Sequence, residues 1–188
     1  MNLYKRIVEL FDANLIYCLI PIILSLMIIE MIYKNRFETR KALNLIRWTI
    51  IVYTIMTGIL YLIETITSVK TDGHEFINRA RGPYAWAYWM MFLSALILPL
   101  TLFIKKLASK FWYVLLIAFG MKIGMYLEQF VIIVTSFHRD FLPSGINYEL
   151  KNVLSFQIGA AFIQGLIITI LILGLFEIMK RNQTMPNN

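Results

Sequence analysis

The chain has 188 residues, of which 59% are hydrophobic and only 15% are charged, and its mean hydropathy is +0.68. An ordinary soluble domain has about half of its residues apolar and about a quarter charged, so this composition excludes one. The formal net charge is +7, but no segment is left over for a folded basic face, which argues against nucleic acid as a partner.

Five apolar blocks follow one another along the chain, and a helix needs about 20 apolar residues to cross a bilayer. The blocks predict an all-α integral membrane protein, a single transmembrane helical domain over residues 1–188, with five helices at about 15–33, 48–68, 83–104, 111–137 and 153–179. Lys5 and Arg6 precede the first block as in a signal peptide, but no small-residue cleavage site follows, so we expect a retained helix. Cys18, the single cysteine, excludes a disulfide or a cysteine metal site within the chain.

With five spans, alternate loops lie on the same side of the membrane, and the loop lysines and arginines fall into two groups. One group has ten members: Lys34, Arg36, Arg40, Lys41, Arg47, Lys105, Lys106, Lys110, Lys180 and Arg181. The other group has seven: Lys5, Arg6, Lys70, Arg79, Arg81, Arg139 and Lys151. Because lysine and arginine gather on the cytoplasmic side, this bias predicts that the N-terminus is outside and the C-terminus inside.

Three charged residues inside the predicted helices are candidates for function, because an ionised group in hydrocarbon usually faces a partner, a cavity or a proton route. Glu64 and Glu128 lie 16 and 17 residues into their helices, which puts both in the outer half of the membrane. The alternative is an interfacial position close to hydrated headgroups. Lys122 lies near the midplane, where an ammonium needs a carboxylate or must release its proton. We expect Glu64 to be its partner, with snorkelling as the alternative.

Further polar groups gather at the predicted outer side. His138, Arg139 and Asp140 follow the fourth helix, and Gln157 enters from the outer end of the fifth. The only other histidine, His74, lies in a polar loop, so a haem with two histidine ligands within this chain is not expected. No metal site is predicted either.

Small and aromatic residues predict how two of the helices are placed. Gly120 and Gly124 form a small-xxx-small pair, which allows close helix packing, and Glu128 continues the same stripe toward a packed neighbour. The third helix opens with four aromatic residues that are typical of a belt at the membrane interface: Tyr84, Trp86, Tyr88 and Trp89.

Two stretches are more specific. Glu75 to Trp89 reads EFINRARGPYAWAYW, and Gly124 to Ser144 reads GMYLEQFVIIVTSFHRDFLPS. Both resemble the NrfD/polysulfide-reductase membrane-subunit family, and they look closest to its branch in alternative complex III, a quinol-oxidising respiratory complex. The resemblance covers roughly Tyr61 to Ser144.

The resemblance implies a helical-bundle subunit that binds quinol near the outer face of a bacterial inner membrane. Such a subunit has no haem or iron–sulfur centre of its own and passes electrons to an iron–sulfur partner, with cytochrome subunits and a second NrfD-like chain as further partners. Glu128, His138 and Asp140 fall on the motif and become the catalytic candidates. The candidates for quinone binding or a proton route are Glu64, Lys122, Arg139 and Gln157.

The chain also departs from the family pattern. Family members have about eight to ten helices in two four-helix bundles, so four of the five helices here would form an NrfD-like half-bundle. Gln129 stands where the family has arginine, and Ala95 and Leu100 replace an expected Asn and Gln around the retained Pro99. These replacements remove charge and hydrogen-bonding capacity.

Three functions therefore stay open at the level of sequence. The first is a quinol-interacting subunit of a respiratory oxidoreductase. The second is a non-catalytic anchor or assembly subunit of such a complex, which the short chain and the lost polar positions favour. The third is a small transporter or channel along Lys122, Glu64 and Glu128, although no inverted repeat is evident.

Overall fold

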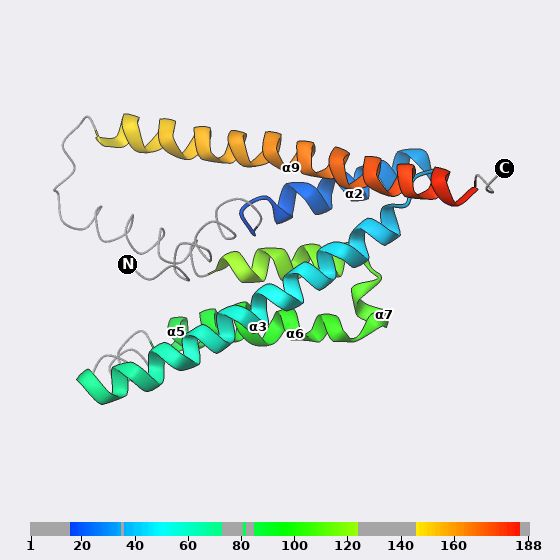
Figure 1. The fold of residues 1–188 in the computed structure, drawn as a ribbon. Helices are drawn as coiled ribbons and strands as arrows, with labels where there is room; N and C mark the ends of the chain where they lie inside the picture. The colour runs from blue at the N-terminus through cyan, green and yellow to red at the C-terminus, as the bar shows by residue number, and fades with distance from the viewer. Residues whose placement is uncertain (1–15, 35, 73–80, 82–84, 124–145, 185–188) are drawn as a thin grey trace.

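The computed structural model describes residues 16–34, 36–72, 81, 85–123 and 146–184, and these residues form helices and short connections without a strand (Figure 1). The labelled elements are α2 (Leu19–Tyr33), α3 (Thr39–Asp72), α5 (Ala85–Phe92), the π-helical turn η2 (Leu93–Ile97), α6 (Leu98–Leu100), the 3-10 turn η3 (Thr101–Phe103), α7 (Lys105–Ala108) and α9 (Ile146–Thr184). A further apolar helix runs from Phe111 to Ile123. Successive long helices alternate in direction (Figure 1).

Three helical segments are long and apolar enough to cross a bilayer: Thr39–Ile63, Ala85–Phe103 and Gly159–Asn182. Two shorter apolar helices, Leu19–Tyr33 and Phe111–Ile123, accompany them. The described residues thus form helices alone, and the chain is an integral membrane protein, as its composition predicts. The rest of the fourth predicted helix, residues 124–137, lies outside the described residues.

The observed helix ends differ from the ends of the apolar blocks. α3 begins at Thr39 and ends at Asp72, where the apolar block alone predicts 48–68, and α9 covers Ile146–Thr184 where the block predicts 153–179. The reason is that backbone hydrogen bonding does not stop at the edge of the hydrocarbon. Polar side chains can extend a helix into water, so apolar length measures the crossing and not the helix.

The segment Ala85–Phe103, which corresponds to the third predicted helix and is called the third segment below, is a single rod with a widened turn in its middle. The Leu98 amide donates a hydrogen bond to the Leu93 carbonyl, five residues back, which defines the π turn η2. Pro99 follows directly and has no amide hydrogen to donate, so the regular ladder is broken at this point. The rod ends where Ile104 adopts an extended conformation.

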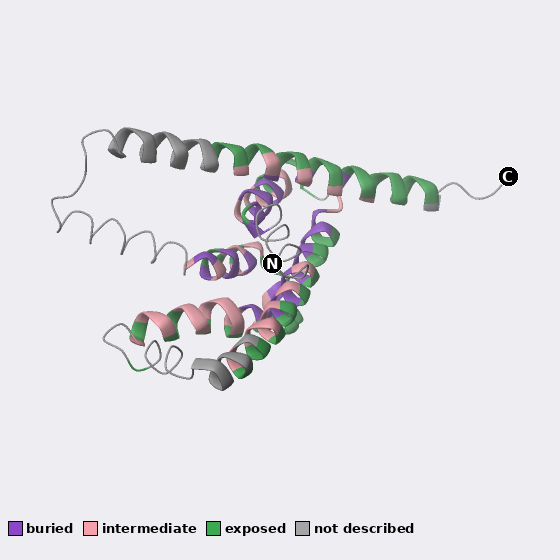
Figure 2. Cartoon of the chain, turned by 60° about the vertical axis from the view of Figure 1, so that its left-hand side comes forward, coloured by how far each residue is buried: buried purple, intermediate pink, exposed green. Residues whose placement is uncertain are grey.

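α2 lies at the centre of the bundle and, together with the first half of α3, contributes most of its buried core (Figure 2). It packs mainly against α9 and also against α3. Its fully buried members include Leu19, Ile22, Ile23 and Leu26. By contrast, α3 and α9 carry many large exposed apolar side chains on their outer faces, as expected for helices that contact lipid.

The helix Phe111–Ile123 packs closely on the third segment at Gly120, as the small-xxx-small pair predicts for that residue. A Cβ at Gly120 would lie 2.7 Å from Leu98 Cδ2 and 3.7 Å from the Ser94 carbonyl oxygen. Gly124 and Glu128, the remainder of the stripe, lie outside the described residues.

One end of the bundle is strongly basic. The α2–α3 connection, α7 with its flanks, and the C-terminal end of α9 meet at this basic end, at the right of Figure 1. They bring together the ten lysines and arginines of the larger group. Lys180 Nζ lies 4.0 Å from the Glu38 carboxylate, and Arg47 Nε donates a hydrogen bond of 2.9 Å to the Leu102 carbonyl, so the segments contact one another directly.

Candidate functional site

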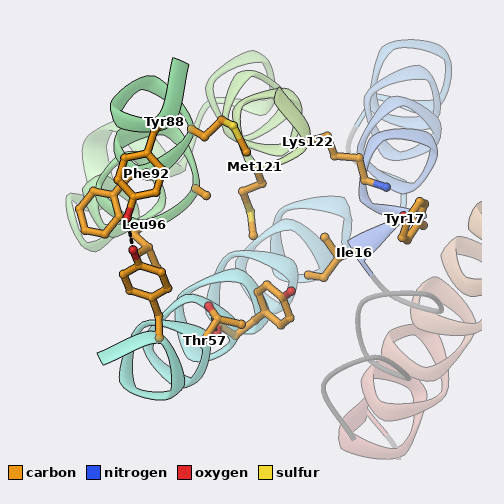
Figure 3. A pocket seen from close by; sticks show the side chains of 12 residues that line it. Ile16, Tyr17, Thr57, Tyr88, Phe92, Leu96, Met121 and Lys122 are labelled. Carbon is orange, nitrogen blue, oxygen red and sulfur yellow. Dashed lines mark hydrogen bonds between the residues drawn. The ribbon is translucent and has the colours of Figure 1, made fainter. Parts of the chain in front are cut away.

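An open cavity of about 430 Å³ lies between α3, the third segment, the helix Phe111–Ile123 and the residues that precede α2 (Figure 3). Its polar lining consists of Tyr17, Tyr53, Thr57, Tyr61, Tyr88 and Lys122. Its apolar lining consists of Ile16, Met91, Phe92, Ala95, Leu96 and Met121. We call it the polar cavity. Its volume falls in the range of about 300–1,000 Å³ that is usual for small-molecule sites.

α3 supplies half of the polar lining through its helical repeat. Tyr53, Thr57 and Tyr61 are spaced four residues apart, which puts them on one face of an α-helix. The Thr57 hydroxyl donates to the Tyr53 carbonyl at 2.9 Å, so this hydroxyl is satisfied within the helix. The Tyr side chains are long enough to project beyond it.

The hydroxyl groups of Tyr61 and Tyr88 are hydrogen-bonded to each other across the cavity wall (Figure 3). This contact joins α3 to α5. The Tyr61 ring also packs against Phe92, with ring centroids 5.7 Å apart. Two aromatic residues therefore close one side of the cavity and present hydroxyl groups there.

Lys122 lies on the other side. It is only 6% exposed, and its Nζ lies 3.4 Å from the centroid of the Tyr17 ring. A cation over an aromatic face is attracted by the ring quadrupole, and the attraction is strongest when both groups are removed from water. The buried ammonium of Lys122 thus lies over the ring of Tyr17, which is itself 40% exposed.

The arrangement provides hydrogen-bond donors at two separated points of the polar cavity, and the other half of the lining residues is apolar. Figure 3 shows Tyr88 at one side and Lys122 with Tyr17 at the other. Such a site suits a flat amphipathic molecule with an acceptor atom at each end. Among the residues that the structure describes, no three His, Cys, Asp or Glu side chains gather closely enough to hold a metal ion.

Of the seven site residues predicted from sequence, only Lys122 has a described side chain. Glu64 lies in the last third of α3 and Gln157 in the first third of α9, but their side chains lie outside the description. The other four predicted residues lie outside the described residues altogether: Glu128, His138, Arg139 and Asp140. The predicted Lys122–Glu64 pair therefore stays a prediction, and the contact that the structure shows is with Tyr17.

Four tyrosines line the cavity, and none of them is among the site residues predicted from sequence. Tyr88, which the sequence predicts in an interface belt with Trp86 and Trp89, binds Tyr61, whereas the two tryptophans are exposed; the belt itself stays a prediction. A usable signal was the four-residue spacing of Tyr53, Thr57 and Tyr61 inside an apolar helix. For Tyr17 the sequence offered no signal, because its role depends on where α2 packs.

Removing one hydroxyl of the Tyr61–Tyr88 pair is expected to have a modest effect on stability. We expect Tyr61→Phe to lower the free energy of unfolding by about 0.5–1.5 kcal/mol, the usual net contribution of a neutral hydrogen bond. A double-mutant cycle with Tyr88→Phe checks this, since the two effects should not add when the hydroxyls bind each other. Strict additivity would contradict the contact.

The two stretches that carry the family resemblance fall mainly outside the described residues, apart from Arg81 and 85–89. No family model, curated protein or solved structure matches the chain. Membership in the NrfD-like family therefore stays a prediction from those stretches, and the polar cavity is the site on which a function can be argued from geometry.

Proposed function

We propose that this chain is a quinol-interacting membrane subunit of a respiratory oxidoreductase complex, and that the polar cavity holds the quinol ring. One observation carries the proposal: a cavity within the apolar part of the bundle has the buried ammonium of Lys122 at one side and tyrosine hydroxyls at the other. The two resembling stretches point to the same chemistry independently.

The cavity lining fits a quinone. A quinone ring is flat, carries an oxygen at each of two opposite positions and continues into an apolar tail. Lys122 and the Tyr61–Tyr88 pair can donate to oxygens at opposite edges, and apolar residues such as Phe92, Leu96 and Met121 can contact the ring faces. The ammonium additionally stabilises negative charge on an oxygen that has lost its proton, because the surroundings are poor in water.

Oxidation of a quinol releases two electrons and two protons. In this proposal the electrons pass to an iron–sulfur partner subunit and the protons pass to carboxylate or imidazole groups, which suit proton acceptance. The candidates are those that the sequence indicates: Glu128, His138 and Asp140, with Glu64, Arg139 and Gln157 assisting. Within the cavity, Lys122 and the tyrosines bind and orient the ring.

The proposal includes the membrane arrangement. We infer five membrane crossings in a bacterial inner membrane, with the N-terminus outside and the C-terminus inside. The convergence of the larger basic group at one end of the bundle supports this orientation. The polar candidates that follow the fourth predicted helix would then lie on the outer side, near an external partner.

Replacing Lys122 by methionine is expected to reduce bound quinone by about tenfold, because a charge-assisted hydrogen bond is lost while the side-chain length is kept. The measurement is extraction and quantification of quinone from tagged protein purified in mild detergent, with proteomics of the same sample for co-purified subunits. Lys106→Met is the matched control, since Lys106 is exposed and lines no part of the cavity. Tyr88→Phe should give a smaller loss.

Equal quinone in wild type, Lys122→Met and Lys106→Met would refute the placement of quinone in this cavity. The second candidate, a non-catalytic anchor, is favoured by Ala95, which lines the cavity at a position where the resembling family has a polar residue. Co-purifying iron–sulfur and cytochrome subunits without quinone would establish the anchor.

A further inference from the structure

We propose that the basic end of the bundle holds an anionic phospholipid, with an acyl chain in a groove along α3 and the phosphate beside Arg40 and Lys105. The groove shares Tyr53 and Thr57 with the wall of the polar cavity but otherwise has its own lining. The proposal concerns a different ligand and does not depend on quinol binding.

The groove has the length and polarity of a lipid-chain site. It encloses about 860 Å³, and its apolar lining is Leu45, Trp48, Val52 and Met56 from α3 with Phe176 from α9. From Leu45 to Met56 the helix rises by about 16 Å at about 1.5 Å per residue. One leaflet contributes about 15 Å, half of a hydrocarbon core of about 30 Å. The apolar part of the groove therefore matches one leaflet in depth.

The mouth of the same groove is basic. Arg40, Lys41 and Asn44 line it, and the Arg40 side chain is 83% exposed. Arg40 Nε lies 3.8 Å from the Glu30 carboxylate, and Lys41 Nζ lies 3.5 Å from that of Glu38. Exposed pairs of this kind are weak, so the cations stay able to bind a second anion.

A second, more polar hollow of about 450 Å³ adjoins the mouth. The groove and this hollow share three lining residues, Arg40, Asn44 and Trp48. The hollow alone has three further polar lining residues, Arg47, Lys105 and Ser109. The Arg47 guanidinium is already bonded to the Leu102 carbonyl and to Asn44 Oδ1. Lys105 is exposed and has no carboxylate partner among the described residues. A phosphate between Arg40 and Lys105 would compensate the positive charge of Lys105.

The apolar groove and the polar hollow lie side by side, and this combination indicates which kind of molecule binds there. A free phosphate would use the polar hollow but leave the apolar groove empty, and a helix of a second copy would fill the groove but place apolar surface against a basic hollow. An anionic phospholipid matches both parts, because basic pockets beside membrane helices bind acidic headgroups and the neighbouring apolar surface takes the chain.

Native mass spectrometry of the full chain in mild detergent tests the headgroup. The probes are phosphatidylglycerol, phosphatidylcholine with the same acyl chains, and inorganic phosphate. We expect phosphatidylglycerol to be retained in preference to phosphatidylcholine, and Lys105→Gln to weaken its binding about fivefold, the effect of one basic residue at an anionic headgroup. Lys106→Gln, the matched control on the same short helix, should leave binding unchanged because Lys106 lines neither hollow.

A second pair of variants tests the groove. Val52→Trp fills it and should reduce retention of phosphatidylglycerol, whereas Ile66→Trp, also exposed on α3 but outside the groove, should not. Equal retention of the two lipids, or equal losses for Lys105→Gln and Lys106→Gln, would overturn the proposal. So would binding of inorganic phosphate that is insensitive to Val52→Trp and displaces the lipid, or a dimer that excludes it.

Discussion

Replacing Gly165 by alanine is expected to lower the free energy of unfolding by about 1–3 kcal/mol, the usual cost of an overpacked contact. Gly165 lies where α9 crosses α2. A Cβ built there would lie 2.8 Å from Pro21 Cγ, 2.9 Å from Pro21 Cβ and 3.3 Å from the Ile22 backbone nitrogen. A proline ring and a backbone atom cannot rotate away, so the two helices must separate.

The helix turns next to Gly165 and Pro21 are also buried, so moving α9 away from α2 is costly. Thr169, one turn along α9, is 1% exposed, and Ser25, one turn along α2, is 9% exposed. Each hydroxyl donates back to its own helix, Thr169 to the Gly165 carbonyl at 2.8 Å and Ser25 to the Pro21 carbonyl at 2.7 Å. Both hydroxyl groups are therefore satisfied within their own helices, and they leave no polar group that needs a partner across the crossing. Small residues such as glycine, serine and threonine are usual where membrane helices pack closely.

The same helix offers matched controls. Gly159 and Gly174 have no atom within 4 Å of an added Cβ, so alanine at either position should be neutral or should stabilise by up to about 1 kcal/mol through helix propensity. Equilibrium unfolding in mixed micelles of SDS and a mild detergent measures all three. If Gly165→Ala behaved like Gly174→Ala, the close crossing of α2 and α9 would be wrong.

Replacing Arg47 by methionine is expected to cost a similar amount, again about 1–3 kcal/mol, because it leaves a buried acceptor without its donor. Arg47 is 7% exposed. Its Nε donates to the Leu102 carbonyl at 2.9 Å and its Nη1 to Asn44 Oδ1 at 3.1 Å, while the guanidinium lies 5.4 Å from the centroid of the Trp48 ring.

The Leu102 carbonyl belongs to the last turn of the third segment, where helical partners run out. Arg47 therefore connects α3 to the end of that segment. Arg36→Met, at an exposed position of the same basic end, controls for the loss of charge and should change stability by no more than about 0.5 kcal/mol. Equal effects of the two substitutions would show that charge, and not this hydrogen bond, is responsible. Unfolding in mixed micelles is the measurement.

The roles of Gly165 and Arg47 could not be predicted from the sequence, whereas that of Gly120 could. Gly120 stood out through its partner Gly124, and its close packing was predicted. Gly165 has no second glycine four residues away and does not stand out in the same way, although it contacts the rigid ring of Pro21 and the backbone of Ile22. Arg47 counted only as one positive charge in a loop, because a hydrogen bond to a residue 55 positions away leaves no local pattern.

The sequence by itself determined that the chain is helical and enters a membrane, and it placed the basic residues that converge at one end. Those properties depend on composition and on apolar length, which are local. Only the tertiary structure decided which polar residues meet. Lys122 lies over Tyr17, and Tyr61 binds Tyr88, because the crossing of helices brings these side chains together. Helix crossing depends on side-chain shape at many contacts at once, and no window of sequence contains that information.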